Sequence, residues 1–259
     1  MNYRTLIPTV LTASIFMTCC SASESSCSLS ELVYMIGDRE VRVMEHVCGD
    51  SGITIFNMHD DENTAVEASL EVIRRHGGRL VELRHSGERL ISFRLLTESY
   101  QVDPNRIFTD KGLENTLEKY SSYSRPAFEA VRTFTSELLE DYGLDDAGLI
   151  ITAHNNGKGE YSAESYQAGA VYETDAAEVF VAEGSDPDDF FFVTTRPVFE
   201  KLKAGGFNVV LQNNQTVTDD GSLSVLAGRK GIPYINCEAA KGHLEEQILM
   251  LEAVWALAD

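Results

Sequence analysis

The sequence predicts a three-layer α/β domain, and three observations support this prediction. Short runs rich in β-branched residues, such as residues 53–58, alternate along the chain with longer segments whose apolar residues recur at helical spacing. Glycine, proline or serine stands at most of the boundaries between them. No repeat, low-complexity tract or linker interrupts residues 30–259. We therefore expect one domain over residues 30–259, with helices on both faces of a sheet.

The predicted elements alternate almost strictly between strand and helix. Strands are expected at residues 53–58, 79–83, 90–95, 148–153, 190–194, 207–212 and 233–237. Helices are expected at residues 64–76, 113–142, 222–229 and 244–258, with one more beginning near Pro197. Gly77 and Gly78 should end the first helix, and Pro126 should break the second, because proline cannot donate a hydrogen bond inside a helix.

Composition places the chain among ordinary globular proteins. Of its 259 residues, 43% are hydrophobic and 24% are charged, so a disordered or fibrous chain is excluded. Its 41 acidic residues against 21 lysines and arginines give a net charge of −20. Nucleic acids and anionic lipid surfaces both bind basic patches, so we expect neither as a direct partner.

The first 19 residues have the features of an export signal. An apolar stretch of 12 residues runs from Leu6 to Met17, which is too short to span a bilayer but typical of a signal peptide. Cys19, Cys20 and a run of small residues follow, an arrangement that resembles the bacterial lipoprotein signal. We expect an exported protein, periplasmic or at the cell surface, that touches the membrane only through a lipid on Cys19 or Cys20. Plain secretion is the alternative.

Three cysteines remain after this signal, namely Cys27, Cys48 and Cys237. Their spacing fits no metal-binding motif, which excludes a cysteine zinc site. Export would permit a disulfide between Cys27 and Cys48. Free buried thiols are the alternative.

Four polar clusters follow predicted strands, where loops present side chains from a rigid sheet. They are residues 59–62, 103–106 and 154–156, together with Glu238. His59 and Glu62 are three residues apart, so both side chains can reach one ion, and His154 supplies a second imidazole. Two histidines and one glutamate with an open fourth position form a catalytic zinc site. A surface histidine in an acidic loop and a capped turn are the alternatives for His59 and His154.

Taken together, these motifs resemble the superfamily of zinc carboxypeptidases, aspartoacylases and succinylglutamate desuccinylases. Residues 102–108 are similar to the Asp-Leu-Asn-Arg-x-Phe stretch of the aspartoacylase branch, residues 152–155 to its Asp-Leu-His-Asn, and residues 232–239 to its strand with the catalytic glutamate. The resemblance implies a mixed, mostly parallel sheet. It also implies one Zn²⁺ ion held by His59, Glu62 and His154.

The resemblance further implies roles for the remaining site residues. Glu238 would carry out the proton chemistry, and Asn105 and Arg106 would read a substrate carboxylate. The arginine that stabilises the oxyanion in many members is missing from its usual place, and Arg94 or Arg89 could substitute. Thr152 stands where the family has an aspartate.

The expected activity is that of an exported zinc amidohydrolase that cleaves an amide next to a free carboxylate. The substrate would be a peptide C-terminus, a cell-wall peptide or an N-acyl amino acid. Residues 157–190 should form the loops above the site, where Tyr161 and Tyr166 are either donors to the leaving group or packing residues. The alternative function is a carboxylate-binding surface lipoprotein of the same fold without turnover.

Overall fold

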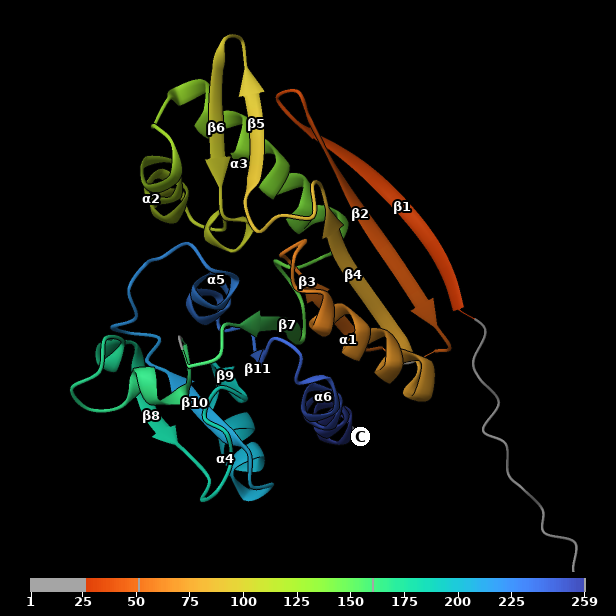
Figure 1. The fold of residues 1–259 in the computed structure, drawn as a ribbon, viewed down its shortest axis with the longest axis vertical. Helices are drawn as coiled ribbons and strands as arrows, with labels where there is room; N and C mark the ends of the chain where they lie inside the picture. Colours follow the sequence, from red (N-terminus) through yellow and green to blue (C-terminus); the bar gives the residue numbers. More distant parts are fainter. Residues whose placement is uncertain (1–26, 51, 160, 259) are drawn as a thin grey trace, which may run out of the picture.

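The computed structural model describes residues 27–50, 52–159 and 161–258 (Figure 1). The predicted signal segment, with Cys19 and Cys20, lies outside these residues. Within the described part of the chain, no helix combines the length and the apolar character needed to cross a bilayer.

The core of the fold is a nine-stranded mixed sheet in the order β1-β2-β4-β3-β7-β11-β9-β10-β8. The strands are β1 (Cys27–Ile36), β2 (Arg39–Cys48), β3 (Thr54–Asn57), β4 (Gly78–Arg84), β7 (Ile150–Asn156), β8 (Ala176–Phe180), β9 (Phe190–Val193), β10 (Asn208–Gln212) and β11 (Tyr234–Ala240). The central strands β4, β3, β7 and β11 run parallel to one another, and the two edge pairs are antiparallel. Strands β5 (Ile91–Leu95) and β6 (Glu98–Val102) form a separate hairpin.

Helices cover both faces of the sheet, which confirms the predicted three-layer α/β class (Figure 1). They are α1 (Asn63–His76), α2 (Asp110–Tyr120), α3 (Arg125–Asp141), α4 (Arg196–Ala204), α5 (Leu223–Lys230) and α6 (Leu244–Ala258). Adjacent strand residues point to opposite faces, so Ile55 packs in the layer of α1, α4 and α6 while Phe56 packs in the layer of α2, α3 and α5. Short 3₁₀ turns occur at Pro104–Arg106 (η1), Ala163–Tyr166 (η2) and Glu173–Asp175 (η3).

The predicted break near Pro126 is confirmed. Helix α2 ends at Tyr120, and α3 starts at Arg125 with Pro126 in its first turn. The hydroxyl of Ser124 accepts a hydrogen bond from the Ala127 amide at 3.2 Å, which caps the new helix. Gly77 likewise caps α1, where its amide bonds the Ile73 carbonyl at 2.9 Å.

The hairpin β1–β2 and the strands β6 and β8 were not predicted. In β1 only Tyr34 and Ile36 are buried, so the strand lacks the clear alternation that marks a half-buried strand. Gly37 closes the hairpin with a φ of +60°, and a Cβ atom there would lie 2.3 Å from the carbonyl oxygen of Arg94. Only glycine allows this close approach of the hairpin to β5.

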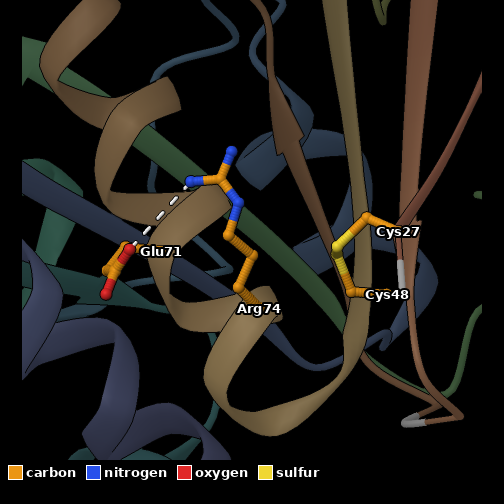
Figure 2. Close-up of a disulfide and its surroundings, with 4 residues drawn as sticks. All are labelled: Cys27, Cys48, Glu71 and Arg74. Carbon is orange, nitrogen blue, oxygen red and sulfur yellow. Dashed lines mark ion pairs between the residues drawn. A yellow bond between two sulfur atoms is a disulfide. The ribbon is translucent and has the colours of Figure 1, made fainter. Parts of the chain in front are cut away.

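The structure shows which cysteines form a disulfide and which is a free thiol. Cys27 and Cys48 form a disulfide that joins the start of β1 to the end of β2 (Figure 2). Cys237 is a buried free thiol in β11. The disulfide therefore closes the open end of the outermost hairpin.

Candidate metal centre

The candidate site lies where three central strands end. Strands β3, β7 and β11 are parallel neighbours, so their carboxyl ends meet at one edge of the sheet. His59 follows β3 in the turn to α1, and Glu62 is the residue before the first turn of that helix. His154 lies in β7, and Glu238 lies directly opposite it in the neighbouring strand β11. The fold thus brings together four residues that the sequence separates by up to 179 positions, from 59 to 238.

The donor atoms of His59, Glu62 and His154 converge on one point. The Nδ1 atom of His59 lies 2.8 Å from Oε1 of Glu62, and the Nδ1 atom of His154 lies 2.9 Å from Oε2. The two Nδ1 atoms are 3.1 Å apart, and all three residues are buried. Within the described chain this is the one group of His, Cys, Asp or Glu side chains whose geometry could hold a metal ion.

Asp103 determines which nitrogen of His59 faces this point. Its Oδ1 atom accepts a hydrogen bond from Nε2 of His59 at 2.9 Å, so Nδ1 is the nitrogen that faces Glu62 and His154. The backbone amide of Asn105 donates to the same carboxylate at 2.9 Å. A carboxylate that orients a ligand histidine in this way is typical of metal sites, so the donor set fits a cation such as zinc.

The charges of the cluster reinforce one another. Burial alone would raise the pKa of Glu62, but the charges of His59 and His154 and their hydrogen bonds hold it well below its usual range. Burial opposes a charge on His59, yet the charge of Glu62 and the hydrogen bond to Asp103 raise its pKa to about 9. The cluster therefore keeps its carboxylates ionised and attracts positive charge, which a metal ion would supply.

Glu238 lies beside this cluster without joining it. Its Oε1 atom accepts a hydrogen bond from the side-chain amide of Asn236 at 3.0 Å. Burial raises the pKa of Glu238 above its usual value, the positive charge of His154 opposes the rise, and the negative charge of Glu62 adds to it. A carboxylate with a raised pKa next to a metal site has the properties of a general base or acid.

Arg89, and not Arg94, reaches the site. The guanidinium of Arg89 donates to Oε1 of Glu62 at 2.8 Å and lies 3.5 Å from Oδ2 of Asp103. Arg94 is exposed on β5, because Ile91 and Phe93 take the inward positions of that strand. Its backbone amide bonds Asp38 in the distant β1–β2 turn. The expectation that Arg94 binds substrate is corrected by this placement.

Asn105 and Arg106 both line the cavity at the site. Nε of Arg106 lies 3.3 Å from Oδ2 of Asp220, and its Nη1 atom donates to the Asn105 carbonyl at 2.6 Å. The side-chain oxygen of Asn105 accepts from the Leu223 amide at 3.1 Å, and its Nδ2 atom lies 3.5 Å from Nε2 of His154. Asn105 therefore ties the metal centre to the start of α5, while Arg106 keeps donor groups free for a ligand.

Two glycines hold Asp220 opposite Arg106. Gly221 has a φ of +82°, and a Cβ atom there would lie 2.3 Å from the Arg106 carbonyl oxygen. A Cβ atom on Gly112 would lie 2.0 Å from Cα of Gly221. Nothing local in the sequence shows that the turn at residues 219–222 packs against η1.

The cavity has a volume of about 690 Å³. Residues of the segment 157–190, including Asp175, line it, as expected, together with Lys119 and Gln212. Tyr161 and Tyr166 share a hydrogen bond between their hydroxyls and pack against Phe190. Burial raises the pKa of both hydroxyls well above the usual value, so both remain neutral donors. The two interpretations of these tyrosines, as packing residues and as cavity donors, are therefore compatible.

Thr152 and the remaining histidines lie outside the group of donor atoms formed by His59, Glu62 and His154. Thr152 bonds the hydroxyl of Tyr234 at 2.7 Å, so it does not replace the aspartate expected by resemblance. Asp103 is the carboxylate that sequence reasoning missed in this role, although it belongs to a polar cluster that was singled out. The remaining histidines bond other partners: His46 bonds Glu82, His76 bonds Glu252, His85 bonds Ser86, and His243 bonds Asp189.

Comparison with known proteins finds a similarity in structure rather than in sequence. No family model matches the chain, and no curated protein matches it. Among solved structures, the chain is similar to an aspartoacylase family protein from Mesorhizobium loti, with 15% identity and a TM-score of 0.44. The match covers 89% of this chain but only 66% of that protein, just under two thirds of its length. A likeness at this identity and TM-score carries no conclusion about the family or the activity of this chain.

Proposed function

We propose that this protein is a zinc-dependent amidohydrolase that cleaves an amide bond next to a free carboxylate. The observation that carries the proposal is the convergence of three metal-type donors beside a buried glutamate, in one cavity that also holds Arg106. A structural ion pair would explain one or two of these groups. It would not explain a carboxylate with a raised pKa beside the open side of a His-Glu-His cluster.

The bound metal would polarise the substrate carbonyl and lower the pKa of water at the site from about 15.7 toward 7. His59, Glu62 and His154 would hold it, with His59 oriented by Asp103. Glu238 would accept the proton of the attacking water on its carboxylate and pass it to the leaving nitrogen. Positioned acid–base catalysis of this kind contributes about 10²–10⁴-fold to the rate.

Two arginines would bind the substrate and stabilise the charge that develops on it. Arg106 binds the substrate carboxylate, since its planar guanidinium suits bidentate recognition, and the side chain of Asn105 keeps η1 in place beneath it. Arg89, held at the metal centre by Glu62 and Asp103, would face the oxygen that gains charge during attack. Lys119 adds further positive charge to the wall of the cavity.

The substrate class and the location of the protein extend this proposal. A peptide C-terminus, a cell-wall peptide or an N-acyl amino acid would present an amide next to a carboxylate. Export, with attachment through a lipid on Cys19 or Cys20, is supported by the Cys27–Cys48 disulfide, because such bonds persist mainly outside the reducing cytosol. The net charge of −20 supports the exclusion of nucleic acid.

A carboxylate receptor without turnover is the competing function. It was suggested by the missing aspartate at position 152 and the missing oxyanion arginine. Asp103 and Arg89 now supply a carboxylate and a guanidinium at the same centre, so both reasons for the receptor lose weight. A receptor would also have no use for Glu238 beside His154.

The Glu238→Gln variant tests the proposal. We expect it to retain one zinc ion per chain and to lose at least about 100-fold in turnover, because glutamine cannot accept the proton. Metal content would be measured by mass spectrometry, and amine release by a screen of N-acyl amino acids and cell-wall peptides. Glu67→Gln, an exposed change on α1, is the matched control and should leave both unchanged. Zinc binding with no product from any substrate in the wild type would favour the receptor.

A further inference from the structure

Among the described residues, no strand pairs with the outer side of β1, so β1 forms an open edge of the nine-stranded sheet (Figure 1). It is 10 residues long, and its register with β2 continues without a bulge from Cys27 to Ile36. The strand contains no proline and no lysine, and Glu31 is its only charged residue. Natural proteins usually protect an edge of this kind with charges, prolines or bulges, because it can pair with another strand.

Two observations show which backbone groups face this free edge. The Cα atoms of Cys27 and Cys48 are 4.2 Å apart, the short spacing of a pair that exchanges no backbone hydrogen bonds. At the other end a two-residue turn joins Ile36 to Arg39, and such a turn closes on a hydrogen-bonded pair. Since the two kinds of pair alternate, Leu29, Glu31, Val33 and Met35 direct their N–H and C=O groups outward.

The side chains on this strand are largely apolar and unprotected. Leu29, Leu32, Val33 and Met35 are 58%, 48%, 50% and 56% exposed. They form four of the nine exposed large hydrophobic residues in the described part of the chain. Exposed apolar side chains that gather on a strand with unpaired backbone groups are typical of an interaction surface.

We propose that β1 pairs with β1 of a second copy of this chain, antiparallel and about a two-fold axis at Leu32. In this register Leu29 lies opposite Met35 of the second copy, and Val33 lies opposite its Glu31. All of these residues are odd-numbered, so their outward backbone groups meet and form hydrogen-bonded pairs. Leu32 meets its own copy across the axis. The two sheets would become one continuous sheet.

The sequence of β1 favours this register over its neighbours. A shift by one residue would set outward backbone groups against groups already bonded to β2. A shift by two in one direction would place Glu31 opposite its own copy, and like charges directly across a pair are destabilising. A shift by two in the other direction would move Leu29 opposite Gly37, which has no side chain to pack against. A self-complementary strand of this kind fits a second copy of itself, because a two-fold interface must match its own surface.

Charge sets the conditions under which this pairing forms. Arg42 on β2 lies 3.8 Å from Glu31 and would remain its counter-ion in the pair. The net charge of −20 on each copy opposes association at long range. Because salt screens this repulsion, the dimer should become tighter as the ionic strength rises. No residue that lines the metal cavity belongs to β1, so the pairing does not depend on the proposed function.

Sedimentation velocity of the purified full chain, with its disulfide intact, tests the proposal. We expect a concentration-dependent dimer, with a dissociation constant that Val33→Glu raises on the order of tenfold or more, since each of the two symmetry-related pairs would then set a carboxylate against Glu31 of the second copy. Leu249→Glu makes the equivalent change at a residue of α6 that is 61% exposed, and it should leave the dimer intact. Val33→Pro should also prevent dimerisation, because it removes an outward N–H but no bond to β2.

A cysteine pair tests the register itself. Leu32→Cys should form a disulfide between two copies under mild oxidation, because position 32 faces itself across the axis at a pair without backbone hydrogen bonds. Ser30→Cys is the matched control and should not form this disulfide, since it would lie opposite Tyr34 of the second copy. Crosslinking at position 30 but not at position 32 would overturn the proposed register.

The proposal is overturned if the full chain stays monomeric at about 100 µM protein in high salt. It is equally overturned if a dimer forms but survives both Val33→Glu and Val33→Pro. Binding of a monomeric chain to phosphatidylglycerol vesicles, lost in Val33→Glu, would assign the same strand to a lipid surface instead. None of these results bears on turnover, so each can be separated from a failure of the proposed hydrolase.

Discussion

Two buried polar networks meet at His154, and they differ in charge. The first network is charged and consists of His59, Glu62, Asp103 and Arg89. The Nδ1 atoms of His59 and His154 both face the carboxylate of Glu62. The second network is neutral and consists of the side chains of Asn155 and Gln247. Gln247 donates to the His154 carbonyl at 2.9 Å and accepts from Asn155 at 2.9 Å.

The neutral network is complete, and the charged cluster is not. The side-chain oxygen of Asn155 accepts from the Ala65 amide at 2.9 Å, so the amides of Asn155 and Gln247 bind one another and join β7 to α1 and α6. In the charged cluster the Nδ1 atoms of His59 and His154 contact different oxygens of Glu62 but lie only 3.1 Å from one another, and a cation between them would give both nitrogens a partner. The comparison teaches that a complete network supports a site, whereas an incomplete one indicates where a ligand binds.

The largest effect should follow from a change inside the charged cluster. Glu62→Gln removes the negative charge of a candidate metal ligand, which is also the charge closest to Arg89. We expect zinc affinity to fall by more than about 100-fold, beyond the loss typical of an indirect contact. Zinc titration against a chelator of known affinity would measure the change, with Glu67→Gln as the control. Unchanged affinity would show that Glu62 is structural.

A smaller effect should follow from the residue that orients His59. Asp103→Asn keeps the shape of the side chain but offers a weaker acceptor to Nε2 of His59. We expect zinc affinity to fall by about 10–100-fold while the fold is retained. The same chelator titration, together with the circular dichroism spectrum, would check this. An affinity equal to that of Glu62→Gln would mean that Asp103 itself binds the metal.

A change in the neutral network should affect stability first. Gln247→Leu has a similar size but leaves the His154 carbonyl and the Asn155 amide without their partner. We expect a loss of about 1–3 kcal/mol in the free energy of unfolding of the metal-free protein. Urea denaturation would measure it, and Leu249→Lys, which is exposed on the same helix, is the control. An unchanged free energy of unfolding would show that water replaces the lost hydrogen bonds.

The smallest effect concerns Glu238 in the metal-free protein. Because burial raises its pKa, the folded state holds this proton more tightly than the unfolded state does. The corresponding stability is present at acid pH and is lost as pH rises through the raised pKa. Glutamine cannot ionise, so the Glu238→Gln variant does not lose this stability as pH rises. Its melting temperature should therefore exceed that of the wild type at pH 8 but not at pH 4.

Melting curves of the metal-free wild type and Glu238→Gln at both pH values would check the prediction. The same raised pKa should place the acid limb of the pH–activity profile above the pH at which an ordinary glutamate titrates. A difference in melting temperature that is independent of pH would contradict the assignment of the raised pKa to Glu238.

Local sequence was sufficient to predict most helices and central strands. Apolar runs such as residues 150–153 mark a strand buried on both faces, and they form β7 with every residue buried. The same reasoning missed β1, because only one side of its final residues packs against the fold. Edge strands give a weak pattern, since burial rather than backbone preference produces the alternation.

The site was predictable where its residues lie near the carboxyl ends of strands. His59, Glu62, His154 and Glu238 stand at strand ends that sheet topology brings together. Arg89 and Arg94 could not be distinguished, because the choice depends on how the β5–β6 hairpin is oriented. Asp220 was equally beyond reach, since it meets Arg106 only through the packing of Gly221 against Gly112.

The sequence alone therefore determined most helices and the central strands, the acidic character of the surface and the residue types available for chemistry near each strand end. These properties are local, because periodicity and composition depend on neighbours along the chain. The tertiary structure alone decided which arginine reaches the candidate metal centre, which carboxylate orients His59, and which strand remains as an open edge. Those outcomes depend on contacts between residues far apart in sequence, and such contacts are fixed only when the sheet is assembled.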